Sequence, residues 1–326
     1  MNKRRGFTLV EILTVVVIIG ILVTLVTAAV KGAMDATKRT RIATQMSQLA
    51  MSLDHYKAEF GEYPPDMLDD EALVRHVKKR WSRLVLPTGG LIVQAEFIRK
   101  SINEAYDDSL TKAFGNAVSA EYGNVDFEMT LLSPVGSLAL WLGGFPNGDG
   151  KLSGFYADPE NPFTQIDTFD QKVFVDMEFG ENKSVRPFRT GDKLFVPVIG
   201  NDIRDVFVPI IYFRGKTSGG HDAYMIPDAG HPKKGEVKQF DFSASSYDLG
   251  FCVAYAESES GGVIKWKNPT TFQLLHPGLD GIFGVAVQGS GPAPLRIIKS
   301  GNNIGQRDLD NITNFSDYKE LKSILP

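Results

Sequence analysis

The chain has few of the residues on which disulfide-rich, metal-binding and nucleophilic proteins depend. Cys252 is its single cysteine, which excludes an intrachain disulfide and a cysteine-rich metal site. Its five histidines are scattered and show no metal-binding i, i+4 spacing. A Gly-x-Ser-x-Gly nucleophile turn does not occur. We therefore expect no enzyme.

Positive charge is not in excess either. The chain has 35 Lys and Arg against 39 Asp and Glu, for a net charge of −4. Nucleic-acid-binding domains usually carry a basic surplus on one face, so no nucleic-acid partner is expected. The composition, 43% hydrophobic and 23% charged, is that of a folded protein rather than a disordered one.

Charged residues are almost missing from Phe7 to Val30. A helix over this run would be about 36 Å long, enough to cross a hydrocarbon core of about 30 Å. A secretory signal has a shorter apolar core and a cleavage site after it, whereas here the small residue Gly6 precedes the run. Either a processed leader or an uncleaved anchor fits this pattern. The basic residues 3–5 place the leader on the cytoplasmic side in both cases.

Glu11 is the exception within the apolar run. A carboxylate inside a spanning helix costs about 2.5 to 3.5 kcal/mol on insertion scales, so such a group usually has a partner. If the chain is cut after Gly6, Phe7 gains a free amino group one helical turn before Glu11. The partner is then either that amine or the amine of a neighbouring copy.

The helix is expected to continue beyond Val30. There is no proline between Ala33 and Phe60, and Gly61 followed by Pro64 is a helix-ending signal. Apolar residues recur in steps of four and three, which indicates one stripe packed on a globular head. The stripe comprises Ile42, Met46, Leu49, Leu53, Tyr56 and Phe60.

The remaining chain is read as helices followed by strands, which makes the fold class α+β. Helices are predicted over 69–86, 91–106, 110–122 and 138–142, with a solvated basic face on the first formed by Arg75, Lys78, Lys79, Arg80 and Arg83. Strands of an antiparallel sheet are predicted over 172–179, 193–199, 206–213, 223–226, 249–256 and 271–275. Pro209 would place its strand at a sheet edge.

The sequence Gly6-Phe7-Thr8-Leu9-Val10-Glu11 and the apolar run after it resemble the type IV pilin and type II secretion pseudopilin family. The resemblance implies cleavage between Gly6 and Phe7 by prepilin peptidase and methylation of Phe7. It also implies that the N-terminal helix assembles into a filament, with Glu11 helping the subunit to enter it. The implied partners are prepilin peptidase, copies of this chain or related pseudopilins, and an inner-membrane assembly platform.

Two C-terminal stretches, 272–281 and 310–315, are similar to the end of the major pseudopilin, which folds around a calcium ion. The resemblance implies Asp280 and Asp310 as side-chain ligands and Leu275 as a carbonyl ligand. Asp308 is a nearby candidate that the family pattern does not directly assign. His276 stands where the family usually has serine, and Asn311 replaces an acidic residue. Alternatively, Asp280 and Asp310 cap backbone amides in turns and no ion is bound.

Together these features predict a pilin-like subunit of a type II secretion pseudopilus, single-pass in the bacterial inner membrane with a periplasmic head. The alternatives are a type IV pilus subunit, or a membrane-tethered binding or enzymatic domain that does not polymerise. The expected division is a leader over 1–6, a long helix over 7–61 with its membrane part over 7–30, a mainly helical insertion over 62–170, and a β-rich head with a C-terminal loop over 171–326.

Overall fold

The computed structural model describes most of the chain, including the long N-terminal helix and the greater part of the head. The described residues are 8–114, 134–175, 185–189, 195–203, 206–216, 224, 243–244, 247–248, 252–284 and 295–326. Gly6 and Phe7 therefore lie outside the described residues, as does the expected strand over 223–226 apart from Tyr224.

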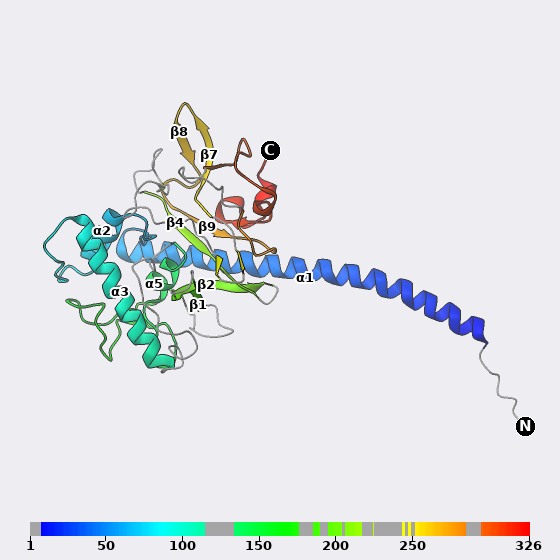
Figure 1. Cartoon of the computed structure of the whole chain (residues 1–326), viewed down its shortest axis with the longest axis horizontal. Helices are drawn as coiled ribbons and strands as arrows, with labels where there is room; N and C mark the ends of the chain where they lie inside the picture. The colour runs from blue at the N-terminus through cyan, green and yellow to red at the C-terminus, as the bar shows by residue number, and fades with distance from the viewer. Residues whose placement is uncertain are drawn as a thin grey trace, which may run out of the picture.

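Helix α1 (Leu9–Phe60) is 52 residues long and dominates the molecule (Figure 1). Its first half projects away from the head, and its second half lies along the head. Thr8 caps its N-terminus, and Gly61, with φ of 75°, ends it in the left-handed conformation that glycine adopts most readily. The predicted continuation past Val30 and the predicted stop at Gly61 are confirmed.

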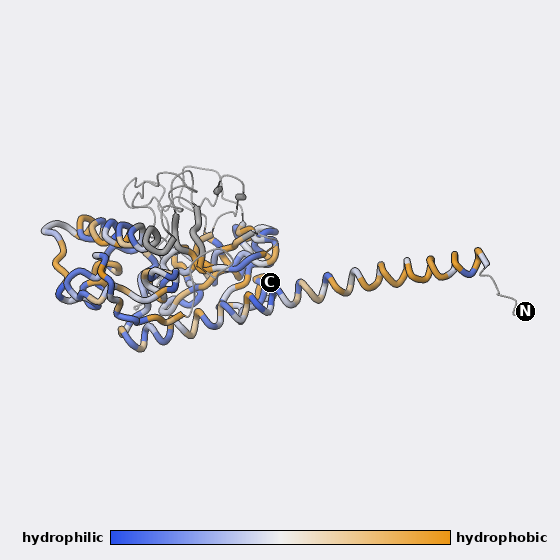
Figure 2. Tube along the Cα trace, turned by 90° about the horizontal axis from the view of Figure 1, so that it is seen from below, coloured by the Kyte–Doolittle hydropathy of each residue, from blue (hydrophilic) through white to orange (hydrophobic). Residues whose placement is uncertain are grey.

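The two halves of α1 have opposite surroundings. Along the projecting half, the large apolar side chains from Leu9 to Met34 are at least half exposed, and this part is the orange, hydrophobic segment in Figure 2. Along the second half, Ile42 is 2% exposed and Met46 is fully buried. The predicted stripe is thus confirmed as the seam between α1 and the head. Its other buried members are Leu49, Leu53 and Tyr56, with Phe60 partly buried.

Helix α2 (Asp70–Arg80) begins at an Asp69 cap, whose carboxylate accepts hydrogen bonds from the backbone N–H groups of Glu71 and Ala72. The apolar spacing predicted that this helix ends at Leu86, but it ends at Arg80. The reason is Trp81, which leaves the helical conformation and is buried against Phe155 and Phe163 at ring-centroid distances of 4.9 and 5.2 Å.

Helix α3 (Leu91–Phe114) replaces two predicted helices with one. The expected break after Tyr106 does not occur. Ser109 stays in the helix because its hydroxyl lies 2.6 Å from both the Ala105 carbonyl and the buried hydroxyl of Tyr156. The predicted residues 115–122 lie outside the described residues.

The strands form small sheets rather than one large sheet. β1 (Val185–Arg189), β2 (Phe195–Ile203) and β3 (Val206–Pro209) form one antiparallel sheet in that order. A second sheet has the order β11 (Ile312–Thr313), β9 (Phe272–His276), β4 (Ile211–Arg214) and is also antiparallel. A third has the order β10 (Arg296–Ile297), β7 (Tyr255–Ser260), β8 (Val263–Trp266), in which β10 pairs with β7 in parallel. β5 (Ser243–Ala244) and β6 (Tyr247–Asp248) pair by themselves.

The predicted run 206–213 is divided at Ile210 into β3 and β4, which belong to different sheets. Pro209 ends β3, an edge strand, as predicted, because proline cannot donate a ladder hydrogen bond. Of the expected strand 172–179, the described residues 172–175 are not in a strand, and the others lie outside the described residues. The predicted α+β class, with a long N-terminal helix on antiparallel strands, is confirmed.

The core is built around the short helix α5 (Ser137–Gly143), all of whose residues are buried. It contacts α1 and strands β2 and β4. Three short 3-10 helices follow at the C-terminus, η1 (Gln306–Asp308), η2 (Asn314–Ser316) and η3 (Leu321–Ser323). Arg39 of α1 pairs with Glu320 beside η3 at 2.7 Å, which ties the end of the chain to the base of the head.

Met46 and Met51 provide a matched test of the seam. Met46 is fully buried on the seam, whereas Met51 is 61% exposed on the same helix. Met46→Ala should lower the free energy of unfolding by about 2–5 kcal/mol, because it removes buried methylene groups and leaves a cavity. Met51→Ala should change it by less than about 0.5 kcal/mol. Urea unfolding of the full chain in detergent measures both, and equal effects would contradict the seam.

Candidate functional site

Glu11 and Thr8 form a closed polar pair at the start of α1. The Glu11 carboxylate oxygen Oε2 accepts hydrogen bonds from the Thr8 backbone N–H and the Thr8 hydroxyl, both at 2.8 Å. The Thr8 hydroxyl in turn accepts from the Glu11 N–H at 3.3 Å. This reciprocal arrangement is a capping box, which satisfies two N–H groups at the beginning of the helix. The predicted pairing of Glu11 with the amine of Phe7 stays a prediction, since Phe7 lies outside the described residues.

The helix around Glu11 offers an otherwise apolar surface. Its threonines hide their hydroxyls by donating to carbonyls of the preceding turn: Thr14 to Val10 and Thr27 to Val23. None of the most apolar window of α1 is buried against the head, and the helix is long and apolar enough to cross a membrane. Glu11 is therefore a carboxylate on an exposed, apolar part of α1.

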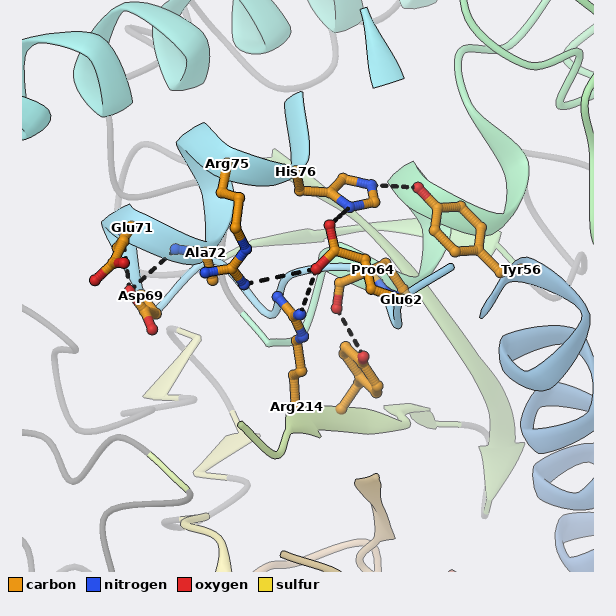
Figure 3. A network of polar contacts seen from close by, with 10 residues as sticks. Tyr56, Glu62, Pro64, Asp69, Glu71, Ala72, Arg75, His76 and Arg214 are labelled. Carbon is orange, nitrogen blue, oxygen red and sulfur yellow. Dashed lines mark hydrogen bonds and ion pairs between the residues drawn. The ribbon is translucent and has the colours of Figure 1, made fainter. Parts of the chain in front are cut away.

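A second polar cluster lies where α1 ends and meets α2 and β4 (Figure 3). Glu62 is its centre. One of its carboxylate oxygens lies 3.1 Å from Nδ1 of His76, and the other accepts a hydrogen bond from Arg214 at 2.8 Å. Nε2 of His76 lies 2.7 Å from the hydroxyl of Tyr56. The cluster thus joins α1, α2 and β4, and we call Tyr56, Glu62, His76 and Arg214 the junction cluster.

Burial and the neighbouring polar groups together determine the charge states of the junction cluster. It lowers the pKa of His76 from 6.5 to about 4 and raises that of Tyr56 from 10.0 to about 12, so both are neutral near pH 7. Burial also acts to raise the pKa of Glu62, but the hydrogen bond to His76 and the positive charge of Arg214 outweigh it and lower this pKa to about 2. The neutral histidine therefore lies between a phenol and a carboxylate that Arg214 neutralises.

The order Tyr56–His76–Glu62 has the form of a hydroxyl, base and orienting acid. Tyr56 is 0% and His76 1% exposed, however, and the hydroxyl faces the arginine Arg80 at 3.2 Å. A nucleophile has to reach a substrate, and this phenol is covered. The geometry is that of a structural joint. Sequence reasoning missed it because Glu62 and His76 are isolated polar residues with no motif between them.

The predicted solvated basic face is confirmed for Arg75, Lys78, Lys79 and Arg83, which are exposed, and is wrong for Arg80. Its side chain is 4% exposed, pairs with Asp170 at 3.3 Å, and stacks on aromatic rings. Its guanidinium carbon lies 4.5 Å from the ring centres of Phe60 and Trp81 and 4.4 Å from that of Phe155. Arg80 therefore fastens the helical region to the head, because an arginine is buried most cheaply against aromatic faces and a carboxylate.

The residues predicted for calcium are placed differently from one another. Asp310 is half-buried, and its Oδ2 accepts from the N–H groups of Leu279 and Asp280 at 2.8 and 3.1 Å. Burial raises the pKa of the Asp310 carboxyl. Asp280 accepts from the N–H of Ile282 at 2.8 Å. Leu275 lies in the central strand β9, paired with Ile211 of β4 on one side and Thr313 of β11 on the other.

Asp308 does not fit a calcium ligand in this arrangement. It is 1% exposed and lies 3.2 Å from the guanidinium of Arg296. Calcium prefers six to eight oxygen ligands, several of them carboxylates. In the described part of the chain, no group of three or more His, Cys, Asp or Glu could hold a metal ion. Asp308 is thus already paired within the chain, and calcium binding by Asp280, Asp310 and Leu275 stays a prediction.

The comparisons with known proteins point to the N-terminal motif. Residues 1–27 match the family described as the prokaryotic N-terminal methylation motif. The chain is 34% identical over 92 residues to type II secretion system core protein G of Klebsiella pneumoniae, covering 28% of this chain and 66% of that protein. It is 41% identical over 74 residues to the protein of that name from Pseudomonas aeruginosa, covering 23% and 52%, and 37% identical over 73 residues to that from Escherichia coli, covering 22% and 50%. No solved structure matches the chain.

In its methylation motif and long apolar helix the chain is similar to pilin-like proteins. Among these, the curated relatives are pseudopilins of the type II secretion system, and the chain is similar to their core protein G. The resemblance seen in the sequence is confirmed. The chain spans only between half and two thirds of the length of these relatives.

The junction cluster gives the head a testable dependence on pH. A buried neutral histidine makes the folded protein less stable on acidification. The reason is that this histidine binds a proton at about pH 6.5 in the unfolded chain, whereas His76 in the folded chain has a pKa of about 4. Between these values each such histidine lowers the free energy of unfolding by up to about 1.4 kcal/mol per pH unit. His276, whose pKa burial lowers to about 3, acts in the same direction. Asp66, whose pKa burial raises to about 6, acts in the opposite direction, as does Asp310.

The free energy of unfolding of His76→Gln should therefore fall less steeply than that of the wild type as the pH is lowered from about 6 to about 4.5. The slopes should differ by up to about 1.4 kcal/mol per pH unit. Urea unfolding of the full chain across this range measures the slope. His55→Gln is the control, because His55 is exposed on α1, and it should keep the wild-type slope. Parallel curves for His76→Gln and the wild type would mean that His76 does not titrate as its burial requires.

Proposed function

We propose that this chain is a structural subunit of a type II secretion pseudopilus, assembled through α1 to support protein export. The observation that carries the proposal is the bare apolar half of α1 with Glu11 at its start, joined rigidly to a folded head. Such a surface is stable either in lipid or against other apolar helices. One helix can therefore serve first as a membrane anchor and then as part of a filament core.

Processing of the N-terminus is the first step of this function. Prepilin peptidase would cleave between Gly6 and Phe7 and leave a methylated amine on Phe7. The match of residues 1–27 to the methylation motif supports this step. The other proposed partners are copies of this chain or related pseudopilins, and an assembly platform in the inner membrane. The leader would face the cytoplasm and the head the periplasm.

Glu11 would direct assembly through an exchange of partners. In the single chain its described donors are the N–H and hydroxyl of Thr8, both neutral. A charged amine from a neighbouring subunit is a stronger partner in an apolar medium, because it compensates the negative charge of the carboxylate, which the neutral Thr8 donors do not. Moving from lipid into the filament would then replace a weak partner by a strong one.

The head would act mechanically and not catalytically. The junction cluster and Arg80 fasten the helical region to α1 and to the strands, so a force on α1 passes to the whole head. The covered Tyr56 hydroxyl supports this interpretation. A type IV pilus subunit and a membrane-tethered domain are the competing functions, and the experiments below distinguish them.

The mature N-terminus is the first test. Intact and N-terminal mass spectrometry of the protein extracted from membranes of its native host should find a chain that begins at N-methylated Phe7. A chain that begins at Met1 would make the apolar segment a plain anchor and contradict the filament function.

Glu11→Leu should abolish incorporation into filaments while membrane insertion and cleavage remain normal, since the apolar helix is unchanged in length. Co-purification with the type II secretion pseudopilus of the host, and secretion of its substrates, are the measurements. Glu59→Leu is the matched control, because Glu59 is an exposed glutamate on the same helix whose pair with Lys172 lies at the surface. It should assemble as the wild type does.

Unchanged assembly of Glu11→Leu would contradict the proposed exchange of partners. Wild-type protein found only in surface pili would assign the chain to a type IV pilus. Protein that is processed but found in neither filament would favour the tethered domain.

A further inference from the structure

Arg296 and Asp308 form an ion pair deep in the C-terminal part of the head. Arg296 lies on β10 and is 2% exposed, and Asp308 ends η1 and is 1% exposed. Arg296 Nη1 lies 3.2 Å from the Asp308 oxygen Oδ1. Two opposite charges removed from water are stable only when they pair closely and their other polar atoms are satisfied. This ion pair therefore connects β10 to η1 in the C-terminal loop.

The Asp308 carboxylate is surrounded by hydrogen-bond donors. Oδ1 accepts from the Gly284 N–H at 3.1 Å, the Tyr255 hydroxyl at 3.2 Å and the Asn311 amide at 3.2 Å. Oδ2 accepts from the Gly305 N–H at 2.9 Å. With Arg296, five groups from β7, β10 and the surrounding loop segments converge on one carboxylate. Oδ1 thus has four donors and Oδ2 one, so protein groups already compensate the charge of this carboxylate.

Glycine permits this close packing. A Cβ added to Gly284 would overlap the Asp308 carboxylate, and one added to Gly278 would overlap Asp310, which accepts from the N–H groups that follow Gly278. Both carboxylates are therefore met by backbone at distances that no other residue type allows. The loop is built around protein-to-carboxylate hydrogen bonds at both positions.

We propose that Arg296 is the resident cation of this C-terminal loop, which folds without calcium. A guanidinium supplies the positive charge that a buried carboxylate requires and delivers it with fixed donor geometry. A calcium ion bound at Asp308 would meet the positive charge of Arg296 and would have to displace the Gly284, Gly305 and Asn311 donors. The replacement of the second acidic residue by Asn311 fits the same design, because its amide donates to Asp308 where a carboxylate would repel it.

The pair also explains how the end of the chain is attached. β10 pairs with β7 through Arg296 and Tyr255, and the Asn311 amide donates to the same Tyr255 hydroxyl at 3.1 Å. The next residue, Ile312, begins β11, which pairs with β9. Arg296 therefore fastens the sheet of β7 to the sheet of β9 through Asp308.

The test uses the full chain in detergent, with thermal unfolding measured in millimolar calcium and in excess chelator. The wild type should show the same Tm in both, and metal analysis should find less than one calcium per chain after dialysis. Arg296→Met should lower Tm by roughly 5–15 °C, because it leaves a buried unpaired carboxylate. Arg296→Lys should lose less, since it keeps the charge.

Arg307→Met is the matched control, because Arg307 is an exposed arginine in η1 next to Asp308, and it should keep the wild-type Tm. If Arg296→Met does not fold while Arg307→Met does, this outcome also supports the proposal, because it shows a greater loss of stability than the expected lowering of Tm. A higher Tm of the wild type in calcium, one tightly held calcium per chain, or equal Tm values for Arg296→Met and Arg307→Met would each overturn the proposal.

Discussion

One continuous helix that has to be stable in two surroundings is the constraint on which the rest of the structure depends. The first half of α1 exposes its apolar side chains, and the second half buries a single stripe of them. No proline and no break separates the halves. The head must therefore leave the first half free and grip the second half along one face only. The seam from Ile42 to Tyr56 and the Arg39–Glu320 pair at its base meet this requirement.

The end of α1 presents a second problem, which polar groups solve. The chain turns at Gly61, and α2 has to be fixed against a helix end and a strand. Glu62 does this from one position, because its two oxygens reach His76 on α2 and Arg214 on β4. Tyr56 completes the contact from α1 itself. A buried polar cluster of this kind adds specificity, since only one arrangement satisfies all its members.

Periodicity and caps were sufficient to predict α1, its stop at Gly61, the seam and the α+β class, because each depends on local spacing. Two kinds of feature were not accessible in this way. Tertiary contacts override local preferences. For example, the hydrogen bond between the Ser109 and Tyr156 hydroxyls lies in the region where two helices were predicted and the single helix α3 forms. Pairs distant in sequence, such as Arg80 with Asp170, carry no local signal. The same limit applies to the pair of Asp308 with Arg296, which lie 12 positions apart without a local motif.

Two largely buried carboxylates of the head differ from Glu11 in the charge of their partners. In the described head, two largely buried ion pairs hold elements together, Glu62 with Arg214 and Asp308 with Arg296. The buried Asp66 instead accepts from two backbone N–H groups. Glu11, by contrast, has only neutral described donors, both from Thr8. A carboxylate with neutral donors in an apolar setting retains most of its desolvation cost. Glu62 and Asp308 thus have cationic partners within the described chain, whereas the described donors of Glu11 are neutral, and the proposed pairing with a neighbouring amine would remove that difference.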